Sequence, residues 1–355
     1  MTEPIKQIVQ VVKRFGRCGG MEEYVYQLSK ELKSAGQNIL ILCEEKVSCP
    51  NDLELEVAEL EVSCRKPRWL SHLLFSQKVK NWIDKYPLEA RIIHSHERIS
   101  CHHITTIHST LFNFPPKGFL SFRKYMNDWL ERREITRNYT QEVIPVSYII
   151  RDQVTAKFPS VIAKLSAPVN PGVKEIKLSP KIRDSSRIKT IGFFGNEWKR
   201  KGLSKVISIW RILNKSDNNC SLILAGFDVN SDIGLSTEEK KQIQNLGWLH
   251  DKAKFYSKID LLIHPAKREA YGMVIPEALS VGIPVLCSKE CGAASIITSG
   301  DGAVLSQGES NEIWAKTASD LLNAKYPKYV SYERPWSRVA NEYMKSYRNI
   351  NFSRS

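Results

Sequence analysis

The chain has 355 residues, enough for two domains that each bury a core of their own. No apolar run approaches the roughly 20 residues that a membrane-spanning helix needs, residues 1–12 lack the apolar core of a signal peptide, and the eight cysteines form no CxxC pair of the kind that zinc sites use. The net charge of +14 is spread along the chain, because residues 1–180 hold 26 basic and 20 acidic side chains (+6) and the remainder 26 and 18 (+8), so neither half is a dedicated basic arm.

The first half alternates strand-like and helix-like segments. An apolar strand at 7–12, a glycine-rich segment at 14–20 and an amphipathic helix at 21–35 come first. Further apolar strands are expected at 38–43, 91–94, 104–108 and 142–147. The segments between them are long enough for helices, so this half is typical of a doubly wound α/β sheet.

A second strand-loop-helix unit follows a polar, charged stretch at 174–189, which we interpret as the interdomain linker. Its strand at 190–195 precedes a helix whose apolar residues repeat at helical spacing from Leu203 to Leu213. Later strands are expected at 221–225, near 246–247, at 259–264 and at 283–286. Two α/β domains result, and open parallel sheets bind ligands at the carboxyl ends of their strands.

Two glutamates, Glu269 and Glu277, have seven residues between them and flank the turn from an expected strand to a short helix at 273–281. Unpaired amides at a helix start attract phosphate, while neighbouring carboxylates suit sugar hydroxyls. The amides concerned belong to Gly272, Met273 and Val274. The pair therefore suggests a nucleotide-sugar site, although on the spacing alone two solvated surface acids would be the better interpretation.

The string from Asp260 to Gly292 resembles the signature of retaining glycosyltransferases of family 4, which have the GT-B fold of two Rossmann-like domains facing a central cleft. Its run at 261–266, its acidic pair and Cys291-Gly292 are similar to those of lipopolysaccharide core glucosyltransferases. The resemblance implies an acceptor-binding domain of residues 1–170 with a return helix in 336–355, and a donor-binding domain of residues 171–335. It also implies that Glu269 faces the sugar hydroxyls and Glu277 the ribose.

Arg200 and Lys201, just before Gly202, are candidates for stabilising the departing diphosphate, because fixed cations at a helix start offset developing negative charge. Alone, such a run would be read as a solvated basic surface. Its position after the strand at 190–195 matches the family, which often has arginine directly after the strand glycine. This chain has Asn196 there, and we expect Arg200 to supply the cation instead.

The resemblance assigns roles to five further residues. Gly19 and Gly20, at the start of the first helix, correspond to a loop that faces donor and acceptor. His108, at a strand end, corresponds to the family histidine near the donor sugar's hydroxymethyl group, the alternative being a satisfied core histidine. Gly247 and Trp248, after a strand, correspond to the segment whose backbone recognises uracil.

We expect no metal and no other cofactor. The chain lacks an Asp-x-Asp pair, and the histidines between 94 and 108 belong to two strands and their loop rather than to a spacing typical of zinc ligands. The helix amides, Arg200 and Lys201 would hold the diphosphate. An NAD-dependent oxidoreductase is disfavoured because residues 14–20 lack the Gly-x-Gly-x-x-Gly pattern.

The expected reaction transfers a hexose, with glucose the first candidate, from a UDP-sugar to a lipopolysaccharide core or related membrane glycolipid, with retention of anomeric configuration. Front-face attack is favoured, and double displacement through an enzyme carboxylate remains open. Two alternatives also remain open. One is a glycosyltransferase of another cell-surface polysaccharide or glycolipid that uses a different nucleotide sugar, and the other is a catalytically silent glycolipid-binding protein of the same fold.

The segment 118–139 is amphipathic and basic, with aromatic residues among Arg123, Lys124, Arg132 and Arg133. This pattern suits an interfacial helix on an anionic membrane, and it suits a packed helix with a solvated face equally well. The run at 65–69 is a weaker candidate. With no nucleic-acid-binding motif in the sequence, we expect an anionic membrane surface as a partner, no nucleic acid, and a cytoplasmic protein associated with the inner face of the cell membrane.

Overall fold

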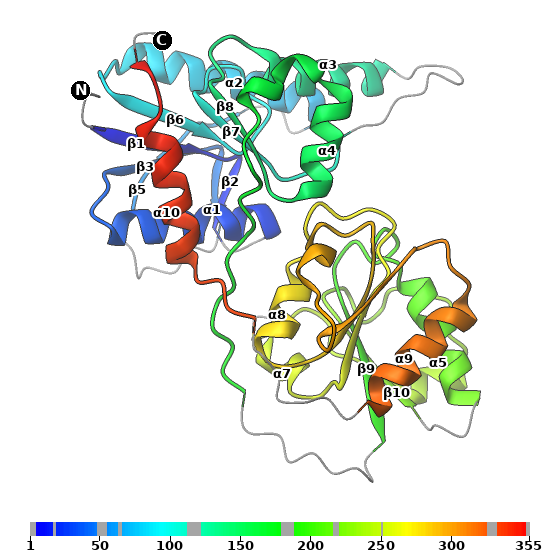
Figure 1. Ribbon diagram of the computed structural model, residues 1–355. Helices are drawn as coiled ribbons and strands as arrows, with labels where there is room; N and C mark the ends of the chain where they lie inside the picture. The colour runs from blue at the N-terminus through cyan, green and yellow to red at the C-terminus, as the bar shows by residue number, and fades with distance from the viewer. Residues whose placement is uncertain are drawn as a thin grey trace. The chain divides into compact units, whose positions relative to one another are not determined.

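The computed structural model describes residues 5–16, 19–47, 55–62, 66–111, 122–178, 188–215, 220–249, 251–324 and 332–352. The chain divides into two compact units: unit 1 comprises Met1–Gly172 with Arg334–Ser355, and unit 2 comprises Val173–Glu333 (Figure 1). Residues 118–121 of the expected membrane segment, residue 65 of the weaker one and residues 179–187 of the expected linker lie outside the described residues.

Unit 1 is built on a six-stranded parallel sheet with the strand order β5-β3-β1-β6-β7-β8. Its strands are β1 (Gln7–Val11), β3 (Ile39–Cys43), β5 (Glu56–Glu59), β6 (Arg91–Ser95), β7 (Ile104–Ile107) and β8 (Glu142–Pro145), and β2 (Arg14–Gly16) pairs separately with β4 (Glu45–Val47). Its helices are α1 (Gly20–Ser34), α2 (Arg68–Lys85), α3 (Phe122–Thr136), α4 (Tyr148–Lys157), the 3-10 turn η1 (Pro159–Lys164) and α10 (Trp336–Arg348).

The carboxyl-terminal helix α10 packs beside α1, as the red and blue helices of Figure 1 show. Trp336, at its start, meets the ring of Tyr24 edge-on at 5.0 Å between centroids. A side chain on Gly172 would lie within 2.8 Å of the Trp336 ring, so only glycine fits there. Arg334 donates from Nε to the Asn170 carbonyl at 3.0 Å. The chain is thus fastened to unit 1 at both points where it passes between the units.

Unit 2 repeats the plan with the parallel order β11-β10-β9-β12-β13-β14. Its strands are β9 (Lys189–Phe194), β10 (Cys220–Ala225), β11 (Ile243–Asn245), β12 (Leu261–His264), β13 (Val285–Ser288) and β14 (Gly302–Leu305). Its helices are α5 (Leu203–Lys215), α6 (Thr237–Gln242), α7 (Ala253–Tyr256), α8 (Val274–Ser280), the 3-10 turn η2 (Gly292–Ile296) and α9 (Asn311–Asn323). The aromatic side chains of Trp210 on α5 and Trp314 on α9 fill the core on one face of this sheet.

The predicted fold class, two Rossmann-like parallel α/β units, is confirmed. In each sheet the strand order reverses beside the first strand, between β1 and β6 and between β9 and β12, which is where open α/β sheets bind ligands. Local expectations differ in two places: residues 14–16 of the glycine-rich segment form β2, and the strand expected near 246–247 lies slightly earlier, as β11. No described helix is long and apolar enough to span a membrane.

Candidate functional site

Glu269 is held on a rigid loop at the carboxyl edge of the unit 2 sheet. The loop follows β12 and its adjoining proline, and Glu269 forms an isolated parallel bridge with Cys291. Its N–H donates to the Glu290 carbonyl at 3.1 Å, and its own carbonyl accepts from the N–H of Gly292 at 3.1 Å. Backbone pairing on both sides fixes where the side chain starts.

Three nitrogen-bearing side chains surround the Glu269 carboxylate. Its Oε2 lies 3.2 Å from Nη1 of Arg200, 3.7 Å from Nζ of Lys201 and 3.9 Å from Nε2 of His264. Burial acts to raise the pKa of Glu269, but Lys201, His264 and Arg200 outweigh it and hold the pKa below its ordinary value. The carboxylate is therefore ionised at neutral pH and can accept hydrogen bonds from hydroxyls.

Arg200 and Lys201 reach Glu269 because the loop after β9 lies directly against the loop after β12. Gly202 adopts φ +85°, and a Cβ there would meet the Pro265 carbonyl oxygen at 2.2 Å. The Lys267 N–H donates to the Arg200 carbonyl at 3.0 Å. Gly195 leaves room for the stem of Lys201, whose Cδ would lie 2.5 Å from a Cβ at that glycine. Glycine is required at 202 both for its conformation and for the close approach.

Gly272, Met273 and Val274 lead into α8 next to Glu269. Gly272 has φ +95°, and the position of its missing Cβ is 3.3 Å from Cγ of Glu269 and 3.8 Å from Nε2 of His264. Met273 is the N-cap of α8 and Val274 its first residue, so their N–H groups precede the intrahelical hydrogen bonds. The predicted amides and the first glutamate thus share one corner of unit 2.

The side chain of Glu277 is engaged elsewhere. Its Oε1 lies 2.5 Å from Nζ of Lys252, and its Oε2 accepts from the buried Tyr256 hydroxyl at 2.8 Å. Neither partner was found from the sequence, because Lys252 and Tyr256 lie 25 and 21 positions before Glu277 and carry no recognisable pattern. In this arrangement a ligand hydroxyl that approaches Glu277 must share its oxygens with Lys252 or displace the Lys252 ammonium group.

Gly247 and Trp248 follow β11, the edge strand of the unit 2 sheet. Gly247 has φ +63°, and its carbonyl accepts from the Gly226 N–H at 2.8 Å, joining the loops after β10 and β11. The indole of Trp248 is 65% exposed. An exposed ring beside a constrained turn offers an apolar face on which a base can stack.

His108 lies at the carboxyl end of β7 in unit 1. Its Nε2 is 2.8 Å from Nδ1 of His96, and its ring meets Tyr24 of α1 edge-on at 4.8 Å between centroids. Burial lowers the pKa of His108 to about 3, so the imidazole is neutral at physiological pH. The interactions of His108 are those of a histidine held in place by its neighbours, with part of its surface open.

Gly19 and Gly20 form the start of α1, four to five residues before Tyr24. Gly19 is the N-cap with extended backbone, and the carboxylate of Glu22 lies so close that a Cβ on Gly19 would be 2.3 Å from its Oε2. Glu22 also pairs with Arg14 at 3.0 Å. The start of α1 therefore already has a carboxylate beside it.

Sequence reasoning missed His264 as a member of the Glu269 corner. It ends β12, is fully buried, and neither ring nitrogen has a hydrogen-bond partner among the described residues. A polar residue that ends an apolar strand directly before a proline was the available signal. It also missed Glu197, which pairs with Arg200 at 2.5 Å.

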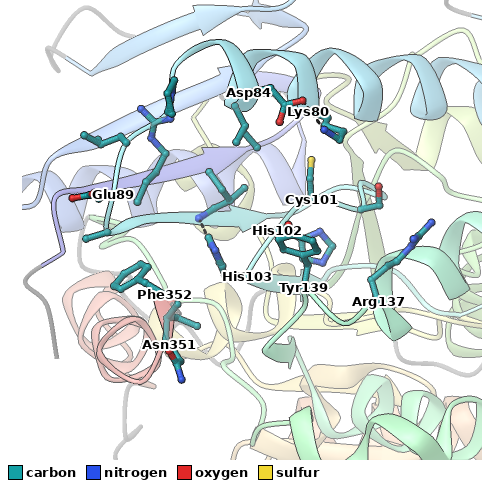
Figure 2. Close-up of a pocket in the computed structure, with 18 of the residues that line it drawn as sticks. Lys80, Asp84, Glu89, Cys101, His102, His103, Arg137, Tyr139, Asn351 and Phe352 are labelled. Carbon is teal, nitrogen blue, oxygen red and sulfur yellow. Dashed lines mark hydrogen bonds and ion pairs between the residues drawn. The ribbon is translucent and has the colours of Figure 1, made fainter. Parts of the chain in front are cut away.

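Within the described residues there is no group of three or more histidine, cysteine, aspartate or glutamate side chains that could hold a metal ion. A cavity of about 1490 Å³ exists in unit 1, but it lies elsewhere. Figure 2 shows His102 and His103 on its wall, with Asn351 and Phe352 from the chain's end and Lys80 paired with Asp84. The cavity borders the starts of β6 and β7, the opposite edge of the sheet from His108, so it is not where this fold binds its main ligand.

Two family models match the chain: "Glycosyltransferase Family 4" over residues 18–172 and "Glycosyl transferases group 1" over residues 176–334. Among curated proteins, the chain is 23% identical over 312 residues to the Schizosaccharomyces pombe phosphatidylinositol N-acetylglucosaminyltransferase gpi3 subunit, covering 80% of this chain and 66% of that protein. It is 30% identical over 131 residues to the Escherichia coli lipopolysaccharide glucosyltransferase WaaG, covering 34% and 35%. The matched regions therefore span less than two thirds of these relatives.

Solved structures agree on the fold. The crystal structure of WaaG aligns with a TM-score of 0.76 at 18% identity, over 96% of this chain and 95% of that one. Anabaena HepE in complex with UDP and glucose aligns with a TM-score of 0.69 at 17% identity, over 98% and 100%. The family models and the solved structures both confirm the predicted resemblance to GT-B glycosyltransferases.

Proposed function

We propose a donor, an acceptor and residue roles for this chain, which belongs to the glycosyltransferases with the GT-B fold. The proposed reaction moves a hexose, glucose first, from a UDP-sugar to a lipopolysaccharide core or a related membrane glycolipid, with retention of configuration. The observation that carries it is the corner of unit 2 where Arg200 and Lys201 converge on Glu269 beside the start of α8.

The charges of that corner fit the reaction. As the bond between sugar and diphosphate breaks, negative charge grows on the diphosphate, and Arg200, Lys201 and the first amides of α8 stabilise it. These cations release Glu269 to bind sugar hydroxyls when a diphosphate arrives as their new partner. We therefore assign Glu269 a role in orienting the sugar through hydrogen bonds to its hydroxyls rather than in nucleophilic attack. The acceptor hydroxyl then attacks from the front face, and a diphosphate oxygen takes its proton.

The remaining roles follow the same proposal. Glu277 binds the ribose hydroxyls, Gly247 and Trp248 border the uracil, and His108 contacts the sugar's hydroxymethyl group. The start of α1 lies beside donor and acceptor. No metal is required, because fixed cations and helix amides supply the positive charge.

UDP release with candidate donors and acceptors tests the proposal. We expect Glu269→Ala to lower kcat/KM by about 100-fold or more, since an orienting contact made in the transition state is lost. Glu238→Ala is the matched control, because Glu238 is an exposed glutamate on α6. Unchanged activity of Glu269→Ala would exclude the assigned role, and absence of UDP binding by the wild type would favour the catalytically silent alternative.

A second donor has support of its own. The relative with the longest sequence match is named as an N-acetylglucosaminyltransferase, and WaaG as a glucosyltransferase. UDP-N-acetylglucosamine is therefore the second candidate after UDP-glucose. A thermal-shift series with UDP- and GDP-sugars separates them, because a ligand that binds only the native state raises Tm.

We further propose that the protein associates with the inner face of an anionic membrane through α3. Phe122 and Tyr125 of this helix are 63% and 60% exposed, and Arg123 and Lys124 between them are exposed too. The later basic residues serve the fold, since Arg133 donates to Ser100 at 2.6 Å. Aromatic and basic side chains at one helix end suit an interfacial contact.

Sedimentation with vesicles that contain anionic lipid tests this surface. Neutralising Arg123 and Lys124 should weaken binding about tenfold or more, because each basic residue near such a surface contributes about 1 kcal/mol. Neutralising Lys240 and Lys241 on α6 is the control with equal loss of charge. Equal effects of the two pairs would mean that net charge, not α3, attracts the protein to vesicles.

A further inference from the structure

A continuous chain of hydrogen bonds crosses the core of unit 1 and ends at His108. It joins residues of β1, β6, β7, α1 and α10 through eight hydrogen bonds of 2.7 to 3.3 Å. In order, its members are the Val169 carbonyl, Tyr24, Tyr343, Thr106, His94, Tyr347, Gln10, His96 and His108.

The carbonyl end of the chain sets its direction. A carbonyl only accepts, so the Tyr24 hydroxyl donates its single proton to Val169. The Tyr24 oxygen then accepts from the Tyr343 hydroxyl, 2.8 Å away. Tyr343 has no second proton, so its oxygen accepts from the hydroxyl of Thr106, also at 2.8 Å. Each hydroxyl has one possible orientation.

The same reasoning assigns the donor and acceptor nitrogens of His94. The Thr106 oxygen must accept from His94 Nε2, 2.8 Å away, so that nitrogen carries hydrogen. Burial holds the pKa of His94 well below its ordinary value, so the ring is neutral and Nδ1 is bare. Nδ1 therefore accepts from the Tyr347 hydroxyl at 2.7 Å. The Tyr347 oxygen in turn accepts from Gln10 Nε2 at 3.0 Å.

The amide of Gln10 determines the donor and acceptor roles of the last two histidines. With its nitrogen directed to Tyr347, its oxygen accepts from His96 Nε2 at 2.7 Å. The His96 ring is neutral as well, because burial keeps its pKa well below the ordinary value, and its Nδ1 is bare. That bare nitrogen accepts from His108 Nε2 at 2.8 Å. His108 therefore carries its hydrogen on Nε2.

We infer that this chain fixes His108 in the Nε2–H tautomer, so that Nδ1 offers the ligand a lone pair and only a hydrogen-bond donor can bind there. Gln10, His96 and Tyr347 act as positioning residues. The His108 side chain is partly exposed, and no described residue is hydrogen-bonded to its Nδ1. Two tyrosines of the carboxyl-terminal helix, Tyr343 and Tyr347, thus help to set the tautomer of His108, which follows β7.

The inference narrows the donor sugar, and in this respect it rests on the proposed function. A hydroxymethyl group can donate its proton to Nδ1, whereas a carboxylate has only acceptor oxygens and would place charge against a lone pair. A UDP-hexose with a free hydroxymethyl group is accepted, and a UDP-uronic acid is rejected. A site whose polar group is left unpaired by the wrong ligand discriminates strongly.

The tautomer itself is measured without ligand. Long-range ¹H–¹⁵N correlation spectra of the full chain, labelled with ¹⁵N-histidine, distinguish the two tautomers at pH 7.5. The His108→Asn variant identifies the His108 signals by their loss. We expect His94, His96 and His108 all to be Nε2–H. A His108 ring with hydrogen on Nδ1, or one averaging between tautomers, overturns the inference.

Tyr347→Phe tests the chain with the loss of one oxygen atom. Without that hydroxyl the Gln10 amide can turn over, and we expect the His108 signals to shift toward the averaged position. Tyr26→Phe removes the hydroxyl of another buried tyrosine on α1, one that is not a member of the hydrogen-bond chain, and should leave the His108 signals in place. If Tyr347→Phe does not fold, Gln10→Leu replaces it. Unchanged signals in the folded variant overturn the role of the chain.

The specificity is tested by comparing UDP-glucose with UDP-glucuronate. We expect kcat/KM to favour the hexose by about 100-fold or more in the wild type, and by about tenfold or less in Tyr347→Phe. Equal use of both donors, with the tautomer as expected, overturns the inferred discrimination. If neither donor binds while the tautomer is Nε2–H, the proposed function is wrong, but the inferred role of the hydrogen-bond chain in fixing the tautomer is supported.

Discussion

The candidate ligand-binding groups around Glu269 in unit 2 are charged, whereas those around His108 in unit 1 are neutral. Around Glu269 two cations lie within 3.7 Å of the carboxylate, on loops that are fixed by backbone pairing. Around His108 the polar atoms are imidazoles, hydroxyls and an amide, and burial keeps the histidines uncharged.

The two units therefore prepare for a ligand in different ways. In unit 2 the charged groups form ion pairs that an incoming diphosphate can rearrange, so binding there depends on which charges are present. In unit 1 a buried hydrogen-bond network fixes the position of each proton, so binding there depends on which ring nitrogen carries hydrogen. Changes in pH should therefore disturb unit 1 first, and loss of a cation should disturb unit 2.

Acid should have the largest effect, because it should unfold unit 1 before unit 2. Six histidines of unit 1 have pKa values lowered from 6.5 mainly by burial: His72, His102 and His108 to about 3, His103 to about 4, and His94 and His96 well below 6.5. Their stabilisation is present above pH 6.5 and is lost as the pH falls toward these folded values, because the unfolded chain takes up protons first. Between pH 6.5 and 5.5 each withdraws about 1 kcal/mol.

Two buried glutamates oppose this loss. Burial raises the pKa of Glu97 to about 7 and of Glu134 to about 8. Their contribution is full below pH 4.5 and is lost as the pH rises through the folded values, so acidification restores about 1 kcal/mol from each over the same interval. Six histidines less two glutamates leaves a net loss of about 4 kcal/mol.

Urea unfolding at pH 6.5 and 5.5, with hydrogen exchange to locate the loss, measures this effect. Peptides of β6 and α10 should lose protection before those of β9. His103→Asn keeps an acceptor for the Ile93 N–H, which donates to His103 Nδ1 at 3.0 Å, and removes one titrating group. The loss should then shrink by about 1 kcal/mol. Equal protection of both units at pH 5.5 would contradict the account.

Lys201→Ala should have the largest effect on catalysis at constant pH. Removing a fixed cation that stabilises the leaving diphosphate should lower kcat by about 100- to 1000-fold, with a smaller change in KM. UDP release measures both. Lys199→Ala is the matched control, because Lys199 is two residues away and lies over the Trp198 ring, 5.1 Å from its centroid. Similar losses in both variants would mean that general positive charge suffices.

Gly202→Ala should cost about 3 kcal/mol or more of unfolding free energy. Its φ of +85° disfavours any side chain, and the new Cβ would meet the Pro265 carbonyl oxygen at 2.2 Å. Gly234 has φ +72°, and no heavy atom lies within 4 Å of the position that an added Cβ would take, so Gly234→Ala carries the conformational cost alone, about 1 kcal/mol. Urea unfolding compares them, and equal costs would show that the loops after β9 and β12 are not tightly packed.

The central strands could be predicted from sequence because they are continuous apolar runs. The edge strands β5 and β14 could not, since their side chains are largely exposed or half-buried and show no such run. The Glu269 corner was partly predictable, because its acid and amides lie within one short motif. His264 lies just before that motif, and only its burial without a hydrogen-bond partner distinguishes it.

The hydrogen-bond chain that ends at His108 could not be predicted from the sequence. Its members come from five elements, and the Gln10–Tyr347 hydrogen bond joins residues 337 positions apart. No local pattern records such a contact, because each residue alone resembles an ordinary buried polar residue of a strand or helix. The same holds for Arg200 and Glu269, which are 69 positions apart and meet only because two loops are packed together.

Arg200 offers the smallest effect and the sharpest test of how charges are placed in unit 2. Its guanidinium divides its contacts between Glu269 and Glu197, so Arg200→Ala should lower kcat/KM by only about tenfold. Asn196 is exposed and lies on the same loop, where other family members often have arginine. If one cation is needed here and either position can supply it, adding Asn196→Arg to Arg200→Ala should restore most of the activity. Asn196→Arg alone should change activity less than about twofold, because the wild type already has its cation. No recovery in the double variant would mean that Arg200 acts by fixing Glu269 rather than by facing the diphosphate.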